Sequence, residues 1–249
     1  TYDAFYGTQQ PLGGNPYGVL SSDNFAKLLY QIQPANPLLD GGPKFFDYGY
    51  QGPSAKGVAN AGDPAVDPAK YVIDPNNSAV DYQIQKFVTG AGTDWFHALF
   101  KNAPLQSHTV SASGANEKNN YYFSLGYLNQ QGTLIDTYFK RYQARINSTF
   151  SITNGIRVGE NLSVFYAESP QGGAPSGGAN IPGGNQGEGN SVSYSYRMQP
   201  EIPVYDIKGN YGGTWAGLTQ LGNAVNPVAT QNQQKYDLSR NWVINGSTY

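Results

Sequence analysis

An alternation of apolar and polar side chains runs through residues 141–152. From 142 to 152 the even-numbered positions are apolar except Ser148, whereas the odd-numbered positions are all polar and include Arg145. A repeat of two residues is that of a β-strand whose two faces meet different surroundings. We therefore predict a strand here, with one apolar and one polar face.

The strand continues into a hairpin whose turn can be located by register. Asn154-Gly155 is typical of a two-residue turn, but that register would place Ile146 on the same face as Ser163. A three-residue loop, 153–155, instead aligns apolar with apolar positions along both strands. We predict this loop, with Gly155 in a left-handed bulge.

Further alternating segments are separated by connections of unequal length. Connections 115–120 and 153–155 are short, 130–138 is intermediate, and 10–104 and 169–234 are long. Outer-membrane barrels have short turns at one end and long loops at the other. Together with the hairpin this gives about six strands, the additional ones being predicted at 1–9, 105–114, 121–130 and 236–249.

The hairpin strands are about 10–15 residues long, whereas strands of soluble proteins average about 5–6 residues and membrane strands need about 9–11. Tyr127, Tyr142 and Tyr166 fall near one common height, as in the aromatic belt of a barrel, and His108 is predicted as an interfacial strand residue. We predict an all-β fold, part of a transmembrane antiparallel β-barrel of which about six strands are present, with long extracellular loops that contain short helices.

This fold predicts which medium each side chain meets. Six strands are too few to close a barrel of this kind, so further strands are expected outside the sequence. The predicted lipid-facing residues are Tyr142, Ala144, Ile146, Phe150, Leu162, Val164 and Tyr166. The predicted lumen-facing residues are Arg141, Gln143, Arg145, Asn147, Asn161 and Ser163, where the arginines have two open roles, contact with substrate or ion pairs with acidic neighbours.

The long connections contain weaker signals. Ser22 is expected to cap a helix over 23–31 and Thr93 a helix over 94–101, in which Trp95 anchors the helix to the barrel rim. Residues 201–211 are predicted as a small hairpin. The Gly, Pro, Ser and Asn content of 169–192 predicts a stretch that buries no core.

Composition excludes several classes of function. The chain has 15 Lys plus Arg, 17 Asp plus Glu and no cysteine, so nucleic acid is not an expected partner and thiolate chemistry is absent. No catalytic motif is present, and we predict neither an enzyme nor a cofactor. His97 and His108 lack a partner at metal-ligand spacing, so no metal site is predicted. Calcium at three Asp-Pro pairs is an open alternative to ordinary turns, at Asp63, Asp67 and Asp74.

Several motifs follow one another in order along the chain. An acidic-Trp helix start stands at 93–95, a strand ending in Ser-x-Ser-Gly at 108–114, and "YYFSLGYLNQQG" at 121–132. "FKRYQARIN" follows at 139–147. This series resembles the start of the barrel in SusC/RagA-like TonB-dependent outer-membrane transporters. The segments "IPVYDIKGNY" and "NPVA" resemble the long third loop of the same family.

The resemblance implies a 22-stranded barrel with an N-terminal plug in the outer membrane of a Gram-negative bacterium. Such proteins import glycans or peptides with a SusD-like surface lipoprotein, and the TonB complex drives uptake through the N-terminal part. Residues 1–249 are then expected to be the N-terminal part of the barrel, with the plug and remaining strands missing. The bilayer and the rest of the same barrel are the other expected partners.

One alternative is a soluble extracellular β-rich binding or adhesion protein. It requires that the face carrying Tyr142, Ile146 and Phe150 pack against a second sheet.

Overall fold

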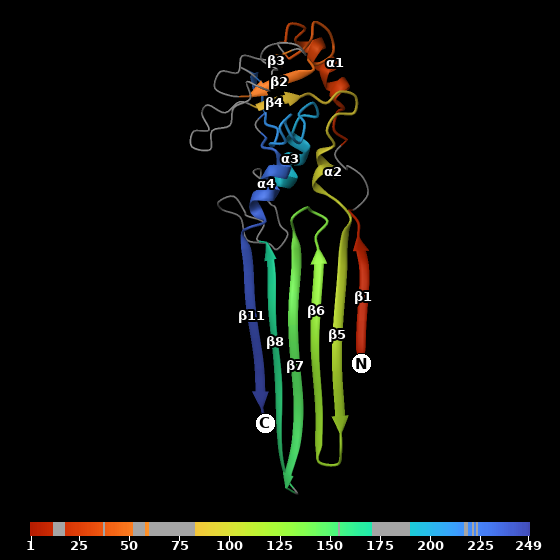
Figure 1. Ribbon diagram of the computed structural model, residues 1–249, viewed down its shortest axis with the longest axis vertical. Coiled ribbons are helices and arrows are strands. Elements are labelled where there is room, and N and C mark those ends of the chain that lie inside the picture. Colours follow the sequence, from red (N-terminus) through yellow and green to blue (C-terminus); the bar gives the residue numbers. More distant parts are fainter. Residues whose placement is uncertain are drawn as a thin grey trace.

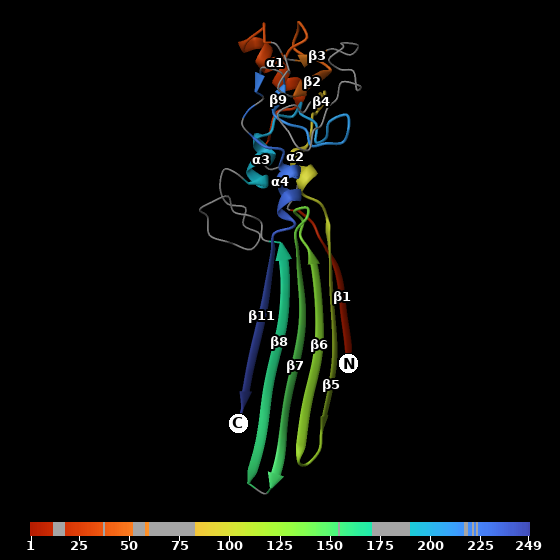
Figure 2. The ribbon, with the colours of Figure 1, turned by 60° about the vertical axis from the view of Figure 1, so that its left-hand side comes forward.

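The computed structural model describes residues 1–11, 18–36, 38–51, 58–59, 83–153, 155–170, 190–216, 219–220, 222 and 224–249. A long sheet extends from a unit that contains all the helices of the described residues, and the turns β5–β6 and β7–β8 lie at the far end of the sheet (Figure 1). A second view shows the same separation, with the helices gathered beyond one end of the strands (Figure 2).

The sheet has six strands in the order β1-β5-β6-β7-β8-β11, and every neighbouring pair is antiparallel. β1 and β11 are its two edges, so the sheet is open. The predicted strands are confirmed, with bounds β1 (Tyr2–Gln9), β5 (Ala103–Ala115), β6 (Asn119–Gln131), β7 (Tyr138–Thr153), β8 (Ile156–Pro170) and β11 (Leu238–Thr248).

The predicted register of β7 and β8 is confirmed, since Ile146 lies opposite Leu162 and Phe150 opposite Val158. The predicted loop 153–155 is wrong at its first residue, because Thr153 is itself paired, with Ile156. A register shift between residues 151 and 153 absorbs the extra residue as a bulge inside β7. The hairpin therefore keeps the register that pairs apolar with apolar residues, although its turn is shorter than predicted. Gly155 has a positive φ of 111°, as predicted.

The described residues between β1 and β5 and between β8 and β11 form one unit, which we name the loop cap. Its small sheets have the orders β3-β2-β4 and β10-β9. No helix among the described residues is long and apolar enough to span a membrane. The elements of the loop cap are α1 (Ser22–Ile32), β2 (Tyr48–Gln51), β3 (Val58–Ala59), β4 (Gln83–Lys86), α2 (Trp95–Leu99), α3 (Ser191–Arg197), β9 (Trp215–Ala216), β10 (Thr219–Gln220) and α4 (Pro227–Gln234).

Both predicted helices are present, and both predicted caps are wrong by one residue. Ser21, not Ser22, accepts the N–H of Asn24 at 3.3 Å and caps α1. Asp94, not Thr93, accepts the N–H of His97 at 3.0 Å and caps α2. In each case the two capping candidates are adjacent. Ser22 is instead the buried first residue of α1, and the hydroxyl of Thr93 donates to the carbonyl of Ile202.

The second long connection is more ordered than its composition predicts. Asn190 caps α3 through the N–H of Ser193 at 2.7 Å, and Ser191 is fully buried, so the expectation that 169–192 buries no core is wrong at its C-terminal end. Residues 171–189 lie outside the described residues. The predicted hairpin at 201–211 is reduced to a turn with one antiparallel bridge, between Tyr205 and Tyr211.

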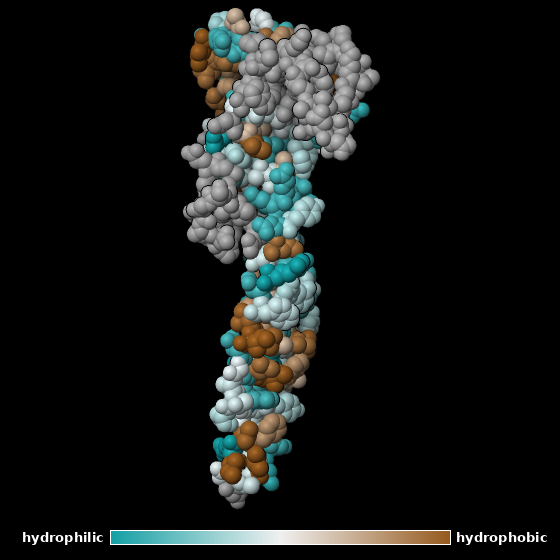
Figure 3. All heavy atoms as spheres, turned by 90° about the vertical axis from the view of Figure 1, so that its left-hand side faces the viewer, coloured by the Kyte–Doolittle hydropathy of each residue, from teal (hydrophilic) through white to brown (hydrophobic). Residues whose placement is uncertain are grey.

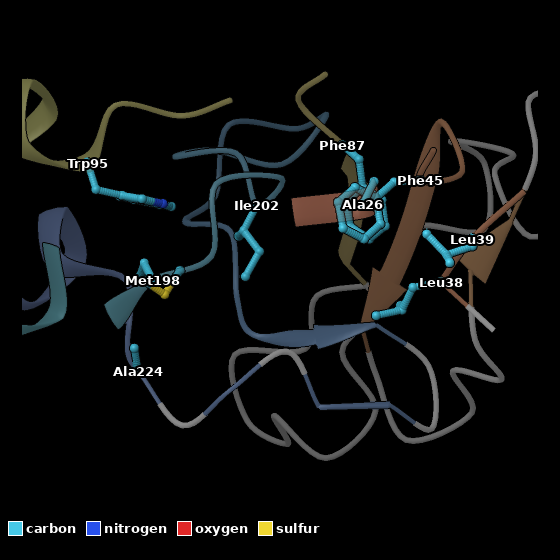
Figure 4. Close-up of a cluster of buried hydrophobic side chains, with 9 residues drawn as sticks. All are labelled: Ala26, Leu38, Leu39, Phe45, Phe87, Trp95, Met198, Ile202 and Ala224. Carbon is cyan, nitrogen blue, oxygen red and sulfur yellow. The ribbon is translucent and has the colours of Figure 1, made fainter. Parts of the chain in front are cut away.

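The hydrophobic core lies in the loop cap (Figure 4). It joins side chains from both long connections, and Ile202 is completely buried. Burial of this kind is the main stabilising contribution in a water-soluble domain. The core cluster consists of Ala26, Leu38, Leu39, Phe45, Phe87, Trp95, Met198, Ile202 and Ala224.

Candidate functional site

The register of the six strands divides their side chains between two faces, because directly paired residues share a face. One face, here named the aromatic face, carries all the predicted lipid-facing residues: Tyr142, Ala144, Ile146, Phe150, Leu162, Val164 and Tyr166. The opposite face, here named the polar face, carries all the predicted lumen-facing residues: Arg141, Gln143, Arg145, Asn147, Asn161 and Ser163.

The aromatic face is uncovered. Tyr142, Phe150 and Ile244 have relative exposures of 50%, 48% and 67%. No second sheet of the described residues packs on it, since the element pairs in contact are neighbouring strands or lie within the loop cap. The sandwich that the soluble alternative requires is therefore not formed by the described residues. Hydrophobic atoms recur along the strands below the loop cap (Figure 3).

An aromatic row crosses this face near the loop cap. His108, Tyr127, Tyr142, Tyr166 and Trp242 are successive partners on five neighbouring strands. Their ring centroids are 6.2, 5.1, 6.3 and 5.0 Å apart in that order. The common height of the three tyrosines is thus confirmed. Trp242 was missed, because its pairing spans the long connection between β8 and β11.

An apolar groove of about 460 Å³ lies beside this row. Ala144, on the central strand β7, is directly paired with Leu125 on one side and Val164 on the other. Its single methyl group is smaller than either neighbour, which accounts for the hollow. Val110 and the five rings of the aromatic row also line the groove.

A charged rung follows the aromatic row on the side of the loop cap. Lys140, Glu168 and Arg240 are directly paired across β7, β8 and β11. Glu168 accepts hydrogen bonds from Arg240 Nε at 3.0 Å, Tyr138 OH at 2.8 Å and Tyr166 OH at 3.1 Å. The ammonium group of Lys140 lies 4.7 Å from the centroid of the Tyr138 ring.

The polar face combines hydroxyl and amide groups with arginines. Arg141 and Arg145 form no ion pair with a described residue. Arg145 borders a groove near the turn end of the sheet, whose other polar lining residues are Asn147, Asn161, Ser163, Asn245 and Ser247. None of these is a carboxylate, so this groove offers donors and neutral acceptors to whatever occupies it.

In the loop cap, α2 is anchored to the second long connection. Trp95 Nε1 donates to the carbonyl of Gln199 at 3.0 Å, and Thr93 Oγ1 donates to that of Ile202 at 2.6 Å. The predicted anchoring of Trp95 to the barrel rim is therefore wrong. Instead, α2 contacts the sheet through the backbone. The N–H of Ile135, in the connection between β6 and β7, donates to the carbonyl of Leu99 at 2.9 Å.

Glu201 is a buried acid within the loop cap. Its relative exposure is 0%, and neither carboxyl oxygen has a side-chain or backbone partner of hydrogen-bond geometry among the described residues. Burial raises the pKa of this carboxyl to about 8, because the charged form loses its hydration. Glu201 is therefore held in its neutral form at neutral pH.

The segments at 202–211 and 226–229 have structural roles in the loop cap. Asn226 donates to the carbonyls of Val204 and Gly212 at 2.9 and 3.0 Å, and its Oδ1 caps α4. Asp206 accepts the N–H groups of Lys208 and Asn210 at 2.9 and 2.8 Å, which closes the turn between them. The polar groups of Asn226 and Asp206 therefore hydrogen-bond within the loop cap and stabilise its conformation.

The described residues contain no cluster of three potential metal ligands. The ring of His97 forms a hydrogen bond with Asp94, the N-cap of α2, and His108 Nδ1 lies 2.8 Å from Tyr2 OH on the aromatic face. The two histidines are thus not brought together. Asp63, Asp67 and Asp74, the calcium alternative, lie outside the described residues.

Known proteins share this sequence pattern and fold. TonB-dependent receptor P3 of Formosa agariphila is 28% identical over 147 residues, which are 58% of this chain and 14% of that protein. TonB-dependent receptor SusC of Bacteroides thetaiotaomicron is 28% identical over 149 residues, which are 55% of this chain and 13% of SusC. No protein-family model matches the chain. The chain therefore aligns with only a small part of each relative's length.

Solved structures of the RagAB peptide importer have the same fold over nearly all of this chain. The alignment with the open-open state covers 99% of this chain and 25% of the importer chain, with a TM-score of 0.55 and 19% identity. The closed-closed state matches 92% and 23%, with a TM-score of 0.54 and 21% identity. The chain is thus similar, in sequence and in fold, to part of a SusC/RagA-like TonB-dependent transporter, with an all-β fold that is a segment of an antiparallel barrel wall.

Proposed function

We propose that this chain is part of the wall and outer loops of an outer-membrane importer of nutrients. The aromatic face is turned to lipid and the polar face to a wet lumen. One observation carries this proposal: apolar side chains are gathered on one uncovered face of a six-stranded sheet, bounded by an aromatic row. In water such a face would be a large exposed apolar patch, whereas in a bilayer it is solvated.

The dimensions of the aromatic face suit a bilayer. Apolar positions extend along β7 from Tyr142 to Ile152. At about 3.3 Å per residue and a tilt of about 40°, ten residues cover a height of roughly 25 Å. That is the height of the apolar band of outer-membrane barrels. Among the described strand residues, Glu160 is the acid that lies within this band, and its carboxylate accepts a hydrogen bond from Ser148 at 3.1 Å.

The edges of the sheet imply a larger wall. In hydrocarbon, unpaired backbone groups along β1 and β11 would each cost several kcal/mol, so we infer that further strands pair with both edges. Residues 1–249 would then be the N-terminal part of a barrel whose plug and remaining strands lie outside this sequence. Within that barrel the predicted lumen-facing residues would line the path of the substrate or contact the plug.

The proposed partners follow from the relatives. A SusD-like surface lipoprotein would cover the loop cap, the TonB complex would act through the N-terminal part, and glycans or peptides would be carried. SusC is a TonB-dependent receptor and RagAB a peptide importer, which supports this class of function but does not choose the substrate. On α1, Leu28 and Ile32 lie on one helix face with relative exposures of 42% and 74%, which suits a protein partner.

Solubility of the full-length protein tests the membrane proposal. We expect the protein in the outer-membrane fraction of a density gradient, extracted only by detergent. A monodisperse monomer in detergent-free buffer would contradict the proposal.

A photo-cross-linking residue at Ile32 tests the lipoprotein proposal. We expect it to capture a surface lipoprotein in intact cells, whereas the same cross-linker at Glu117, in the turn at the opposite end of the sheet, does not. Equal products from both positions, or none from Ile32, would contradict the proposed partner.

A further inference from the structure

We propose that the aromatic face contains a specific site for an anionic, phosphate-bearing lipid of the leaflet on the loop-cap side. The groove at Ala144 would hold an acyl chain, and Lys140 with Arg240 would bind the phosphate. This inference rests on the proposed function, because it requires that the aromatic face meet lipid.

The groove supplies the acyl-chain part of the site. Its accessible lining is almost entirely apolar, and about 460 Å³ lies within the roughly 300–1,000 Å³ typical of small-molecule sites. Most of the aromatic face consists of side chains that project outward, whereas at Ala144 the flanking Leu125, Val164 and tyrosine rings surround a hollow. An acyl chain lying there would contact more protein surface than one lying elsewhere on this face.

The charged rung supplies the headgroup part. Lys140 is the next residue of β7 on the same face as Tyr142, so the rung lies about 7 Å from the aromatic row along the strand. Aromatic rows lie at the level of lipid headgroups, and the rung therefore lies where phosphates are found. It carries two cations and one anion, Lys140, Arg240 and Glu168.

Among the described residues, both carboxylate oxygens of Glu168 already accept hydrogen bonds, whereas N–H groups of Lys140 and Arg240 remain available to a ligand. Both oxygens of Glu168 accept hydrogen bonds, from Tyr138 on one side and from Arg240 and Tyr166 on the other. Arg240 uses Nε for this contact and has further N–H groups on a side chain that is 59% exposed. The ammonium of Lys140 is held over the ring of Tyr138 and forms no ion pair with a described residue.

The rung thus has a net positive charge and unused donors beside an apolar groove. The phosphate of such a lipid would accept hydrogen bonds from Lys140 and Arg240 together. The acyl chain of the same lipid would extend past the aromatic row into the groove. A lipid with a neutral headgroup would still place its acyl chain in the groove, but it would lack the attraction between the phosphate and the net positive charge of the rung. The two parts of the site are therefore separable by substitution.

Trp242 provides a fluorescent reporter at the groove, since it lines the groove and is directly paired with Tyr166. The full-length protein is reconstituted into phosphatidylcholine nanodiscs that contain a small fraction of acyl-brominated lipid, either phosphatidylglycerol or phosphatidylcholine. The signal of Trp242 is the difference between the wild type and W242F. Bromine quenches tryptophan only at contact, so quenching reports occupancy of the groove.

We expect the brominated phosphatidylglycerol to quench Trp242 at a mole fraction at least roughly tenfold lower than brominated phosphatidylcholine, because two cations contribute. K140A and R240A should each reduce this preference about fivefold. A144F should weaken quenching by both lipids. K27A, which removes an exposed cation from α1 of the loop cap, should leave the preference unchanged.

Three outcomes would overturn an element of this account. Equal quenching by both lipids in the wild type refutes the headgroup site while leaving the proposed function intact. A preference that persists in K140A and R240A does the same. Absence of quenching by either lipid shows that the aromatic face does not meet lipid, and it refutes the proposed function together with the inference.

Discussion

The sheet and the loop cap are stabilised in opposite ways. In the loop cap, side chains from two distant parts of the chain bury one another, and Leu99 and Ile202 have no exposed surface. In the sheet, backbone ladders join six strands while the apolar side chains of one face remain open, as Trp242 does with 67% exposure. The loop cap supplies its own apolar environment, whereas the sheet requires one from outside. Under the proposed function, the same chain is therefore adapted to two solvents, water and lipid.

The largest expected effect is in the core of the loop cap. Trp95→Ala removes a ring that is 3% exposed and its hydrogen bond to Gln199, and should destabilise the loop cap by about 3–5 kcal/mol. Hydrogen exchange of the full-length protein should then accelerate over 190–235 but not over 138–168. Trp242→Ala is the matched control, because its ring lies outside that core. Simultaneous loss of protection in both regions would show that the two are not separate units.

Charge on the aromatic face should have the next largest effect. Ile146→Arg should destabilise the protein in lipid vesicles by about 2–4 kcal/mol, because arginine near the midplane must leave hydrocarbon or carry water into it. Asn147→Arg, one residue further on the polar face, should cost little. Urea unfolding of the reconstituted protein measures both. Equal losses would mean that the two faces do not meet different media.

Glu201 should make the loop cap sensitive to pH. Its folded pKa of about 8 lies above the ordinary value of 4.5, so the folded state binds more protons between these values and stability falls as pH rises through this window. Glu201→Gln should remove this dependence and stabilise the loop cap at pH 7.5 on the order of 2 kcal/mol, with little change at pH 4.5.

Thermal unfolding of the loop cap, followed at the two pH values, tests this prediction. Glu117→Gln is the matched control, since Glu117 is exposed in the turn between β5 and β6. A wild-type loop cap that is more stable at pH 7.5 than at pH 4.5 would contradict the predicted sign.

A smaller effect is expected at the cap of α4. Asn226→Ala removes the acceptor for Val228 and Ala229 and two donated hydrogen bonds, and should cost about 1–2 kcal/mol locally. Exchange of the α4 amides measures it. Gln233→Ala, at an exposed position of the same helix, should leave these amides unchanged or slightly more protected, because alanine favours helix at least as well as glutamine. Equal acceleration of exchange in both variants would contradict a specific role for the Asn226 cap.

The two regions also differ in how far sequence predicts them. Alternation specifies a strand residue by residue, so the pairing of Ile146 with Leu162 followed from the pattern. The loop cap has no repeat, and contacts such as Trp95 with Gln199 join residues far apart in the chain. The serine-rich α3 has weak helix propensity, and burial against its neighbours overrides it.

For the candidate site, the sequence predicted which residues of β7 and β8 share each face of the sheet. It did not predict the aromatic row and the charged rung that span neighbouring strands. Trp242 and Arg240 join the aromatic row and the charged rung only because β11 pairs with β8, which no local pattern specifies. The bulge near Thr153 was missed for a related reason, since a single unpaired residue leaves the alternation of the rest unchanged. The media that the two faces meet remain predictions.

A spin-label scan of positions 141–152 in the full-length protein in lipid bilayers tests these media most directly. Labels at the even positions should be reached by oxygen, which concentrates in lipid, and labels at the odd positions by a water-soluble nickel complex. Accessibility should therefore alternate with a period of two residues. Even positions shielded from both reagents, or accessibility without this alternation, would contradict a wall between lipid and water.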